Sequence, residues 1–192
     1  MGLALIDQDG VVADFERGLL DAFRAEYPGA PFIDLGDRRA FYAHRQYAER
    51  FGPEWGEAVR ALARRDGFFL GLPAIAGAVD ALKEMDEAGH AVFLCTSPLS
   101  GSRSCVPDKL AWVEDRLGQE WVDRVIISKD KTLVGDRLQR CVLVDDRPEI
   151  TGCATRPPWQ HVLFAAPYNE KTQDRPRLRA WASWREVLAP YL

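Results

Sequence analysis

The chain has 192 residues, which is the length of one domain or of one domain with a small insertion. Its formal net charge is −4 and its arginines are scattered, so the composition predicts no nucleic-acid polymer as a partner. No apolar run is long enough to cross a membrane, and four cysteines without a CxxC pair favour a reduced, cytoplasmic protein over a zinc or disulfide protein.

The first predicted element is a strand over residues 3–6, an apolar run typical of a strand buried on both faces of a parallel sheet. Because only Met1 and Gly2 precede this run, we expect no targeting leader. Asp7 and Asp9 follow at the carboxyl end of the strand, where open α/β sheets bind their ligands. Gly10 then allows the chain to turn sharply.

Two carboxylates in this position suit phosphoryl transfer. One can attack phosphorus and form an acyl phosphate, while the other protonates the leaving oxygen and later takes a proton from water. Their oxygens also suit Mg²⁺. Taken alone, the tetrapeptide from Asp7 to Gly10 is equally typical of a surface turn.

Residues 16–72 carry helical and aromatic patterns that interrupt the strand–helix alternation of a parallel sheet. We interpret this stretch as a helical cap inserted after the first strand, with residues 1–15 and 73–192 forming the core domain. A helical subdomain that only packs on the core is the alternative, because aromatic side chains at helical spacing usually form a core. We expect one helix with Phe15, Leu19, Leu20 and Phe23, one capped by Asp37 with Phe41, Tyr42 and Tyr47, and one after Gly52-Pro53 with Trp55, Val59 and Leu62 that ends near Gly67.

From Ile75 onward, strands and helices alternate, which predicts an α/β fold with right-handed crossovers. Together with the first strand, this gives a Rossmann-like parallel sheet of five strands flanked by helices. The expected elements are a helix from Ile75 to Gly89, a strand over 91–95, a helix from about Pro107, strands over 125–128, 141–144 and 161–165, and a last helix from Trp181 to Leu188.

Polar residues follow several of these strands, and parallel strands bring such ends to one edge of the sheet. Thr96 could hydrogen-bond a phosphoryl oxygen, Lys131 could neutralise charge, and one acid of the pair Asp145 and Asp146 could complete a Mg²⁺ site. Each of these residues alone is also typical of an ordinary loop. Their joint placement at strand ends predicts a phosphoryl-transfer site.

The motifs extend well beyond single residues. Matching segments are DQDGVVADFE, FFLGLPAIAGAVDALKEM, FLCTSPL, KLAWVEDRLG, ISKDKT, LVDDRP, PPWQHVLFAAPYN and WASWREVL. In this order they resemble the haloacid dehalogenase (HAD) superfamily of phosphatases and, within it, the 5′(3′)-deoxyribonucleotidases over nearly the whole chain. The resemblance implies a HAD-like fold and a phosphoric monoester hydrolase.

Such an enzyme would be Mg²⁺-dependent and would act on deoxyribonucleoside 5′(3′)-monophosphates, with pyrimidine nucleotides such as dUMP and dTMP favoured. The resemblance implies that Asp7 is the nucleophile, Asp9 the general acid and base, and Thr96 and Lys131 the phosphoryl ligands. It assigns the metal to Asp7, the Asp9 backbone carbonyl and Asp146, with Asp145 beside them. The implied base and sugar pocket consists of Phe15, Phe41, Tyr42 and Phe69, together with Ser97, Leu99 and Lys129.

This chain departs from the family pattern at four places. Gln8 stands where the family usually has methionine, and Lys129 stands where it has arginine, which loses a planar fork of donors. The loop over residues 100–104 lacks bulky side chains, and about four extra residues lie near Arg137–Arg140. These departures affect the expected base preference more than the chemistry.

Two alternatives stay open at this point. The chain could be a HAD phosphatase for another small phosphomonoester, or a phospho-accepting domain like a signalling receiver, which also combines aspartates, threonine and lysine. An aromatic cap disfavours a receiver, because a receiver needs an open rim for its partner. A homodimer also stays open, and the expected partner is a small nucleotide rather than a membrane or a polymer.

Overall fold

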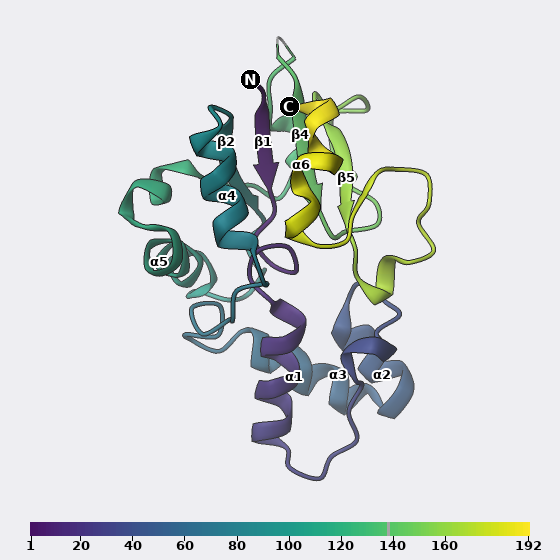
Figure 1. Ribbon diagram of the computed structural model, residues 1–192. Coiled ribbons are helices and arrows are strands. Elements are labelled where there is room, and N and C mark those ends of the chain that lie inside the picture. Colours follow the sequence, from purple (N-terminus) through teal and green to yellow (C-terminus); the bar gives the residue numbers. More distant parts are fainter. Residues whose placement is uncertain (138) are drawn as a thin grey trace.

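The computed structural model describes residues 1–137 and 139–192, and its centre is a sheet of parallel strands (Figure 1). The six strands lie in the spatial order β3-β2-β1-β4-β5-β6. Their bounds are β1 (Leu3–Ile6), β2 (Ala91–Thr96), β3 (Val125–Ile127), β4 (Cys141–Asp145), β5 (Gln160–Phe164) and β6 (Arg177–Leu178).

The sequence predicted five strands, and the structure corrects this to six. The added strand, β6, pairs with β5 in parallel, with Phe164 opposite Leu178. It has two residues and begins with an arginine, so it leaves no apolar run that periodicity could detect. The α/β fold with a parallel sheet is otherwise confirmed.

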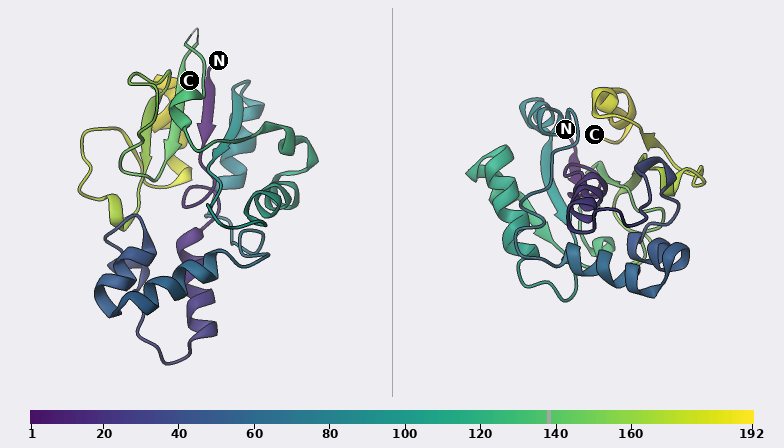
Figure 2. Two further views of the ribbon diagram at one scale, coloured as in Figure 1. Left: turned by 180° about the vertical axis from the view of Figure 1, so that it is seen from behind. Right: turned by 90° about the horizontal axis from the view of Figure 1, so that it is seen from below.

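One face of the sheet packs against three helices: α4 (Ala78–Glu87), α5 (Cys105–Leu117) and α6 (Trp184–Leu188). Ala4 and Ile6 point to this side, because successive side chains of a strand alternate between its faces. Leu3 and Leu5 point to the other side, where they belong to a cluster against which loop residues such as Trp159 pack. Figure 2 shows the sheet and the helices from behind and from below.

The helices α1 (Phe15–Glu26), α2 (Ala43–Phe51) and α3 (Pro53–Ala63) lie beyond the carboxyl ends of the strands (Figure 1). They have an apolar cluster of their own, which includes Phe23, Tyr47 and Leu62. We call this unit the helical unit; its role as a cap domain stays a prediction.

Within the helical unit, one predicted cap is wrong and one boundary is confirmed. Asp37 ends a 3₁₀ turn over Leu35–Asp37, and α2 begins only after Tyr42. Arg38, directly after this turn, has an extended backbone, and its guanidinium forms an ion pair with Glu16 of α1. Gly52-Pro53 does separate α2 from α3, with Pro53 as the first residue of the new helix.

Other helix ends differ by a few residues from their predictions. Ile75 precedes α4, which starts after Gly77 because the backbone of Gly77 is left-handed (φ 75°). The helix predicted from about Pro107 starts at Cys105, and Pro107 is tolerated in its first turn. The last helix is split into a 3₁₀ turn, Trp181–Ser183, and α6.

Of the insertion predicted near Arg137–Arg140, Leu138 lies outside the described residues. Among the helices of the two described ranges, none is both long enough and apolar enough to span a bilayer.

Candidate active site

The carboxyl end of β1 turns tightly and places its two acids at the edge of the sheet. The backbone N–H groups of Val12 and Ala13 both donate to the Gln8 carbonyl, at 2.9 and 2.8 Å. Gly10 is left-handed (φ 74°), and a Cβ added there would lie 2.2 Å from Asp146 Oδ2. Only glycine therefore lets this turn approach the end of β4 so closely.

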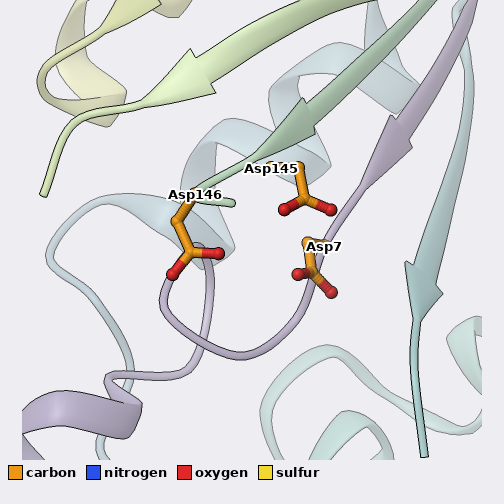
Figure 3. Close-up of side chains that lie close together, drawn as sticks. All are labelled: Asp7, Asp145 and Asp146. Atoms are coloured by element: carbon orange, nitrogen blue, oxygen red, sulfur yellow. The ribbon is translucent and has the colours of Figure 1, made fainter. Parts of the chain in front are cut away.

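Three carboxylates meet at this edge, from Asp7 after β1 and from Asp145 and Asp146 at the end of β4 (Figure 3). Each offers an oxygen within 4.8 Å of the others. Lys131, on a 3₁₀ turn after β3, lies 2.8 Å from Asp7 Oδ1 and 2.6 Å from Asp145 Oδ2. The sequence-predicted acids and lysine thus come together from three separate strands.

Burial and the neighbouring charges shift the pKa values of this cluster. Burial, and then the Asp145 and Asp7 carboxylates, raise the pKa of Asp146 well above its usual value. Burial also raises the pKa of Asp7, although Lys131 opposes the rise. For Lys131, burial disfavours the charged form, but Asp7 and Asp145 outweigh it and raise the pKa.

This donor set fits a divalent cation. Its three carboxylates share one buried ammonium group, that of Lys131, so the cluster keeps an excess of negative charge. Carboxylate oxygens are the ligands that hard cations prefer. Burial is the main cause of the raised pKa of Asp146, and a cation placed among Asp7, Asp145 and Asp146 would offset the repulsion between carboxylates that adds to it.

A buried lysine that the sequence analysis did not identify stands beside the second acid. The ammonium nitrogen of Lys109, on α5, lies 2.8 Å from Asp9 Oδ2 and donates to Thr96 Oγ1 at 2.7 Å and to the Ser97 carbonyl at 2.8 Å. Its side chain is 1% exposed. Burial raises the pKa of Asp9, and Lys109 limits that rise.

The signal for Lys109 was present in the sequence. Cys105, Trp112 and Val113 form the buried stripe of α5, and Lys109 falls within that stripe at helical spacing. A lysine in an apolar stripe needs a partner, because an isolated buried charge is costly. Gln8 supports the arrangement, since its amide Nε2 donates to the Lys109 carbonyl at 3.2 Å.

Above the acids, a cavity of about 580 Å³ lies between the sheet edge and the helical unit. Its volume lies in the range of small-molecule sites, roughly 300–1,000 Å³. Asp7, Asp9, Thr96, Lys131, Asp145 and Asp146 all line it. So do the residues predicted for the substrate pocket, which are Phe15, Phe41, Tyr42, Phe69, Ser97, Leu99 and Lys129.

These pocket residues do not contribute equally. Phe69 is 2% exposed, so most of its ring belongs to the core, and the Ser97 hydroxyl is committed to the Ser128 carbonyl at 2.8 Å. Tyr42 is 37% exposed, and Phe41 packs edge-on against it with centroids 5.1 Å apart. The helical unit therefore presents Phe41 and Tyr42 to the cavity.

Tyr168, in the turn after β5, is another cavity residue that the sequence analysis did not identify. Its hydroxyl donates to Asp146 Oδ2. Burial, and then the Asp146 carboxylate, raise the pKa of Tyr168 well above its usual value, so the hydroxyl keeps its proton. The segment that contains Tyr168 was part of the family resemblance. Tyr168 itself was not singled out, because a side chain in a turn has no periodic pattern that marks it.

Comparison with known proteins gives a consistent result. A family model described as "5' nucleotidase, deoxy (Pyrimidine), cytosolic type C protein" matches residues 2–190. The human "5'(3')-deoxyribonucleotidase, cytosolic type" is 42% identical over 190 residues, covering 96% of this chain and 92% of its own. The human "5'(3')-deoxyribonucleotidase, mitochondrial" is 42% identical over 189 residues, covering 96% of this chain and 81% of its own.

Solved structures agree on the fold. A HAD family hydrolase from Deinococcus radiodurans superposes with a TM-score of 0.64 at 16% identity, over 100% of this chain and 96% of its own. At this identity, the likeness concerns the fold alone. It confirms the HAD-like arrangement that the motifs implied.

Proposed function

Because this chain belongs to the 5′(3′)-deoxyribonucleotidase family of phosphomonoester hydrolases, we propose that it removes phosphate from deoxyribonucleoside 5′- and 3′-monophosphates with Mg²⁺ as its metal. We further propose an aspartyl-phosphate intermediate on Asp7 and a preference for pyrimidine nucleotides such as dUMP and dTMP. The printed name of the matching family includes pyrimidine, which supports that preference.

One observation carries the proposed chemistry: each acid of the β1 turn lies beside a different buried lysine. Lys131 lies 2.8 Å from Asp7 and Lys109 lies 2.8 Å from Asp9, at one end of a cavity large enough for a nucleotide. Phosphoryl transfer depends mainly on positioning and charge neutralisation, and these two lysines supply both.

In the first step, an Asp7 oxygen attacks phosphorus and a bond from phosphorus to Asp7 forms. The bond between phosphorus and the sugar oxygen breaks, and that oxygen takes a proton from Asp9. The pKa of Asp9 is raised by burial, which favours a protonated donor. Thr96 and Lys131 hold the non-bridging oxygens of the phosphoryl group.

In the second step, water attacks phosphorus and gives a proton back to Asp9. The bond from phosphorus to Asp7 breaks, which releases inorganic phosphate and restores the Asp7 carboxylate. Asp7, the Asp9 carbonyl and Asp146, with Asp145 beside them, would hold Mg²⁺. The bound ion would supply positive charge for the phosphoryl oxygens.

The base and deoxyribose would lie against the aromatic side of the cavity. Phe41 and Tyr42 offer flat apolar surface there, and Phe15 and Leu99 also line the cavity. Stacking on aromatic rings is worth roughly 1–3 kcal/mol per base. Lys129 is exposed and lines the same cavity, where it could reach a base oxygen.

Of the alternatives, the receiver-like domain is set aside because the family is one of phosphomonoester hydrolases. A different small phosphomonoester stays the second candidate. Hydrolysis of a panel of nucleoside monophosphates with Mg²⁺ tests both at once. We expect deoxyribonucleotides to be the preferred substrates. If simple phosphate esters without a base are hydrolysed as fast as deoxyribonucleotides, the proposal is contradicted.

We also propose the cytoplasm as its site of action, because the four cysteines are all free. Reaction of the native protein with a thiol reagent after gentle lysis tests for reduced cysteines. A homodimer stays an expectation. Light scattering of the purified protein measures its oligomeric state.

A further inference from the structure

Tyr168 stands between the acidic cluster and the helical unit. On one side its hydroxyl donates to Asp146 Oδ2. On the other side its ring is contacted by two residues of the segment that precedes α2: the guanidinium carbon of Arg38 lies 5.7 Å from the ring centroid, and the Phe41 ring packs edge-on at 5.8 Å. The family resemblance assigns no role to Tyr168.

The Asp146 side chain is closely surrounded by its neighbours. A Cβ on Gly10 would lie 2.2 Å from Asp146 Oδ2 and 3.3 Å from the Tyr168 hydroxyl, so these groups are in close contact. The amide of Asn169 also donates to the Asp146 backbone carbonyl, at 2.7 Å. A carboxylate has about four acceptor positions, so a donor on one oxygen leaves others for a cation.

Arg38 is itself firmly held. It is 2% exposed, and its guanidinium forms a two-point ion pair with Glu16 of α1, at 2.5 Å and 3.0 Å. It also donates to the side chain of Gln46 in α2. A cation over an aromatic face within about 6 Å is attractive, and more so when it is desolvated. Arg38 thus brings a buried guanidinium group of the helical unit against the Tyr168 ring.

We propose that Tyr168 is a positioning residue that holds Asp146 in the orientation a divalent cation requires, and that Arg38 couples the position of the helical unit to this metal site through the Tyr168 ring. The inference rests on the proposed metal-binding function of Asp146. Loss of an outer partner of a metal ligand typically weakens metal affinity by about 10–100-fold.

The test measures metal binding without substrate. We would titrate the full chain with Mn²⁺, follow free Mn²⁺ by electron paramagnetic resonance, and compare the parent with Tyr168→Phe. The variant should bind Mn²⁺ at least about tenfold more weakly. In turnover, it should need more Mg²⁺ while keeping most of its kcat at saturating Mg²⁺.

Tyr47→Phe is the matched control. Its hydroxyl is also buried and hydrogen-bonded, accepting from the Ile33 N–H at 3.2 Å, but it lies inside the helical unit. It should leave the Mn²⁺ affinity unchanged. Tyr168→Phe removes only the hydroxyl oxygen and leaves the rest of the side chain in place. A thermal melting curve checks that the variant is folded.

Arg38→Lys tests the coupling. It keeps a charge for Glu16 but loses the planar group over the ring. We expect weaker Mn²⁺ binding than in the parent, and no further weakening when it is combined with Tyr168→Phe. Additive losses would overturn the coupling through Tyr168.

Suppose that the parent is active and that Asp146→Asn no longer binds Mn²⁺. If Tyr168→Phe then binds Mn²⁺ as tightly as the parent does, the inference is overturned and the proposed function stays intact. A parent protein that neither binds Mn²⁺ nor hydrolyses nucleotides would overturn both.

Discussion

Lys109 lies 2.8 Å from Asp9 and donates to the Thr96 hydroxyl at 2.7 Å, so one buried ammonium group joins the proposed acid–base residue to the proposed phosphate ligand. Its ring neighbour is Phe69, whose centroid is 5.1 Å from the lysine nitrogen. Because the Lys109 side chain is 1% exposed, water and salt screen its charge only weakly.

The first prediction concerns this ion pair. Lys109→Met keeps the length of the side chain but removes the charge, so Asp9 loses the group that limits its pKa. Asp9 would stay protonated and act poorly as the base of the second step. We expect kcat/KM for dUMP to fall about 100-fold, within the usual range for acid–base groups. The exposed Lys83→Met on α4 is the control; a loss of less than threefold would contradict the role.

The second prediction concerns the nucleophile. Asp7→Asn keeps the shape of the side chain but removes the attacking carboxylate, so turnover should be abolished. Burial raises the pKa of Asp7, Lys131 opposes the rise and Asp145 adds to it, so the net effect is that the folded protein disfavours the charged carboxylate and its removal relieves that cost. The melting temperature should therefore stay equal or rise. Steady-state rates and a thermal melt measure both, and activity within tenfold of the parent would refute the assignment.

The third prediction separates the two acids at the end of β4. Asp145 Oδ2 is engaged by Lys131 at 2.6 Å and Asp145 Oδ1 accepts from the Arg147 N–H at 2.9 Å, whereas Asp146 faces Gly10 and Tyr168. Chelation should remove activity, and added Mg²⁺ should restore it. Asp146→Ala should then raise the Mg²⁺ concentration for half-maximal activity more than Asp145→Ala does. Equal effects would show that the division between the two acids is wrong.

Much of the site could be predicted because its members directly follow apolar runs. Asp7, Thr96 and Asp145 each end or follow a buried strand, and the parallel order of the strands brings these ends together. Lys109 was missed because helix periodicity assigns stripe positions to the core. Tyr168 comes from a turn, where no period distinguishes one side chain from another.

Register and contacts between distant segments also lie beyond sequence patterns. Arg38 and Tyr168 are separated by most of the chain, and only the folded arrangement places the guanidinium over the ring. The strand β6 is too short for a pattern, and it forms because β5 offers an open edge beside it. Predictions from local sequence therefore succeed for strand ends and fail for tertiary pairs.

The fourth prediction concerns acid stability. Asp130 caps the turn that carries Lys131: it accepts from the Thr132 hydroxyl and N–H and from the Cys153 N–H, and these bonds lower the pKa of Asp130 to about 2. A folded pKa below the usual value stabilises the protein at all pH values above about 4. That contribution is lost as the pH falls through about 2.

Asp130→Asn removes this titration. The difference in unfolding free energy between parent and variant should be constant above pH 4 and should narrow as the pH falls toward 2. Urea unfolding at several pH values measures it. A difference that widens on acidification would mean that the carboxylate is not the stabilising form.

The last prediction concerns the aromatic side of the cavity. Phe41 is half-buried, packs against Tyr42 and lies 5.4 Å from the Arg147 guanidinium carbon. If its ring holds the base, Phe41→Ala loses stacking worth roughly 1–3 kcal/mol, which is about tenfold to a hundredfold in kcat/KM. For a small phosphate ester without a base, the kcat/KM of the variant should fall little. Equal losses on both substrates would make Phe41 structural.

Because Phe41 also touches Tyr168, the Mn²⁺ affinity of Phe41→Ala must be measured beside its kinetics. Unchanged metal binding with a nucleotide-specific loss would separate substrate stacking from an effect on Asp146.

The same apolar surface predicts the choice of sugar. A ribose 2′-hydroxyl that loses water without a partner costs roughly 1–3 kcal/mol. We therefore expect dUMP to be hydrolysed with a kcat/KM about tenfold or more above that of UMP, and equal values would exclude an apolar sugar slot.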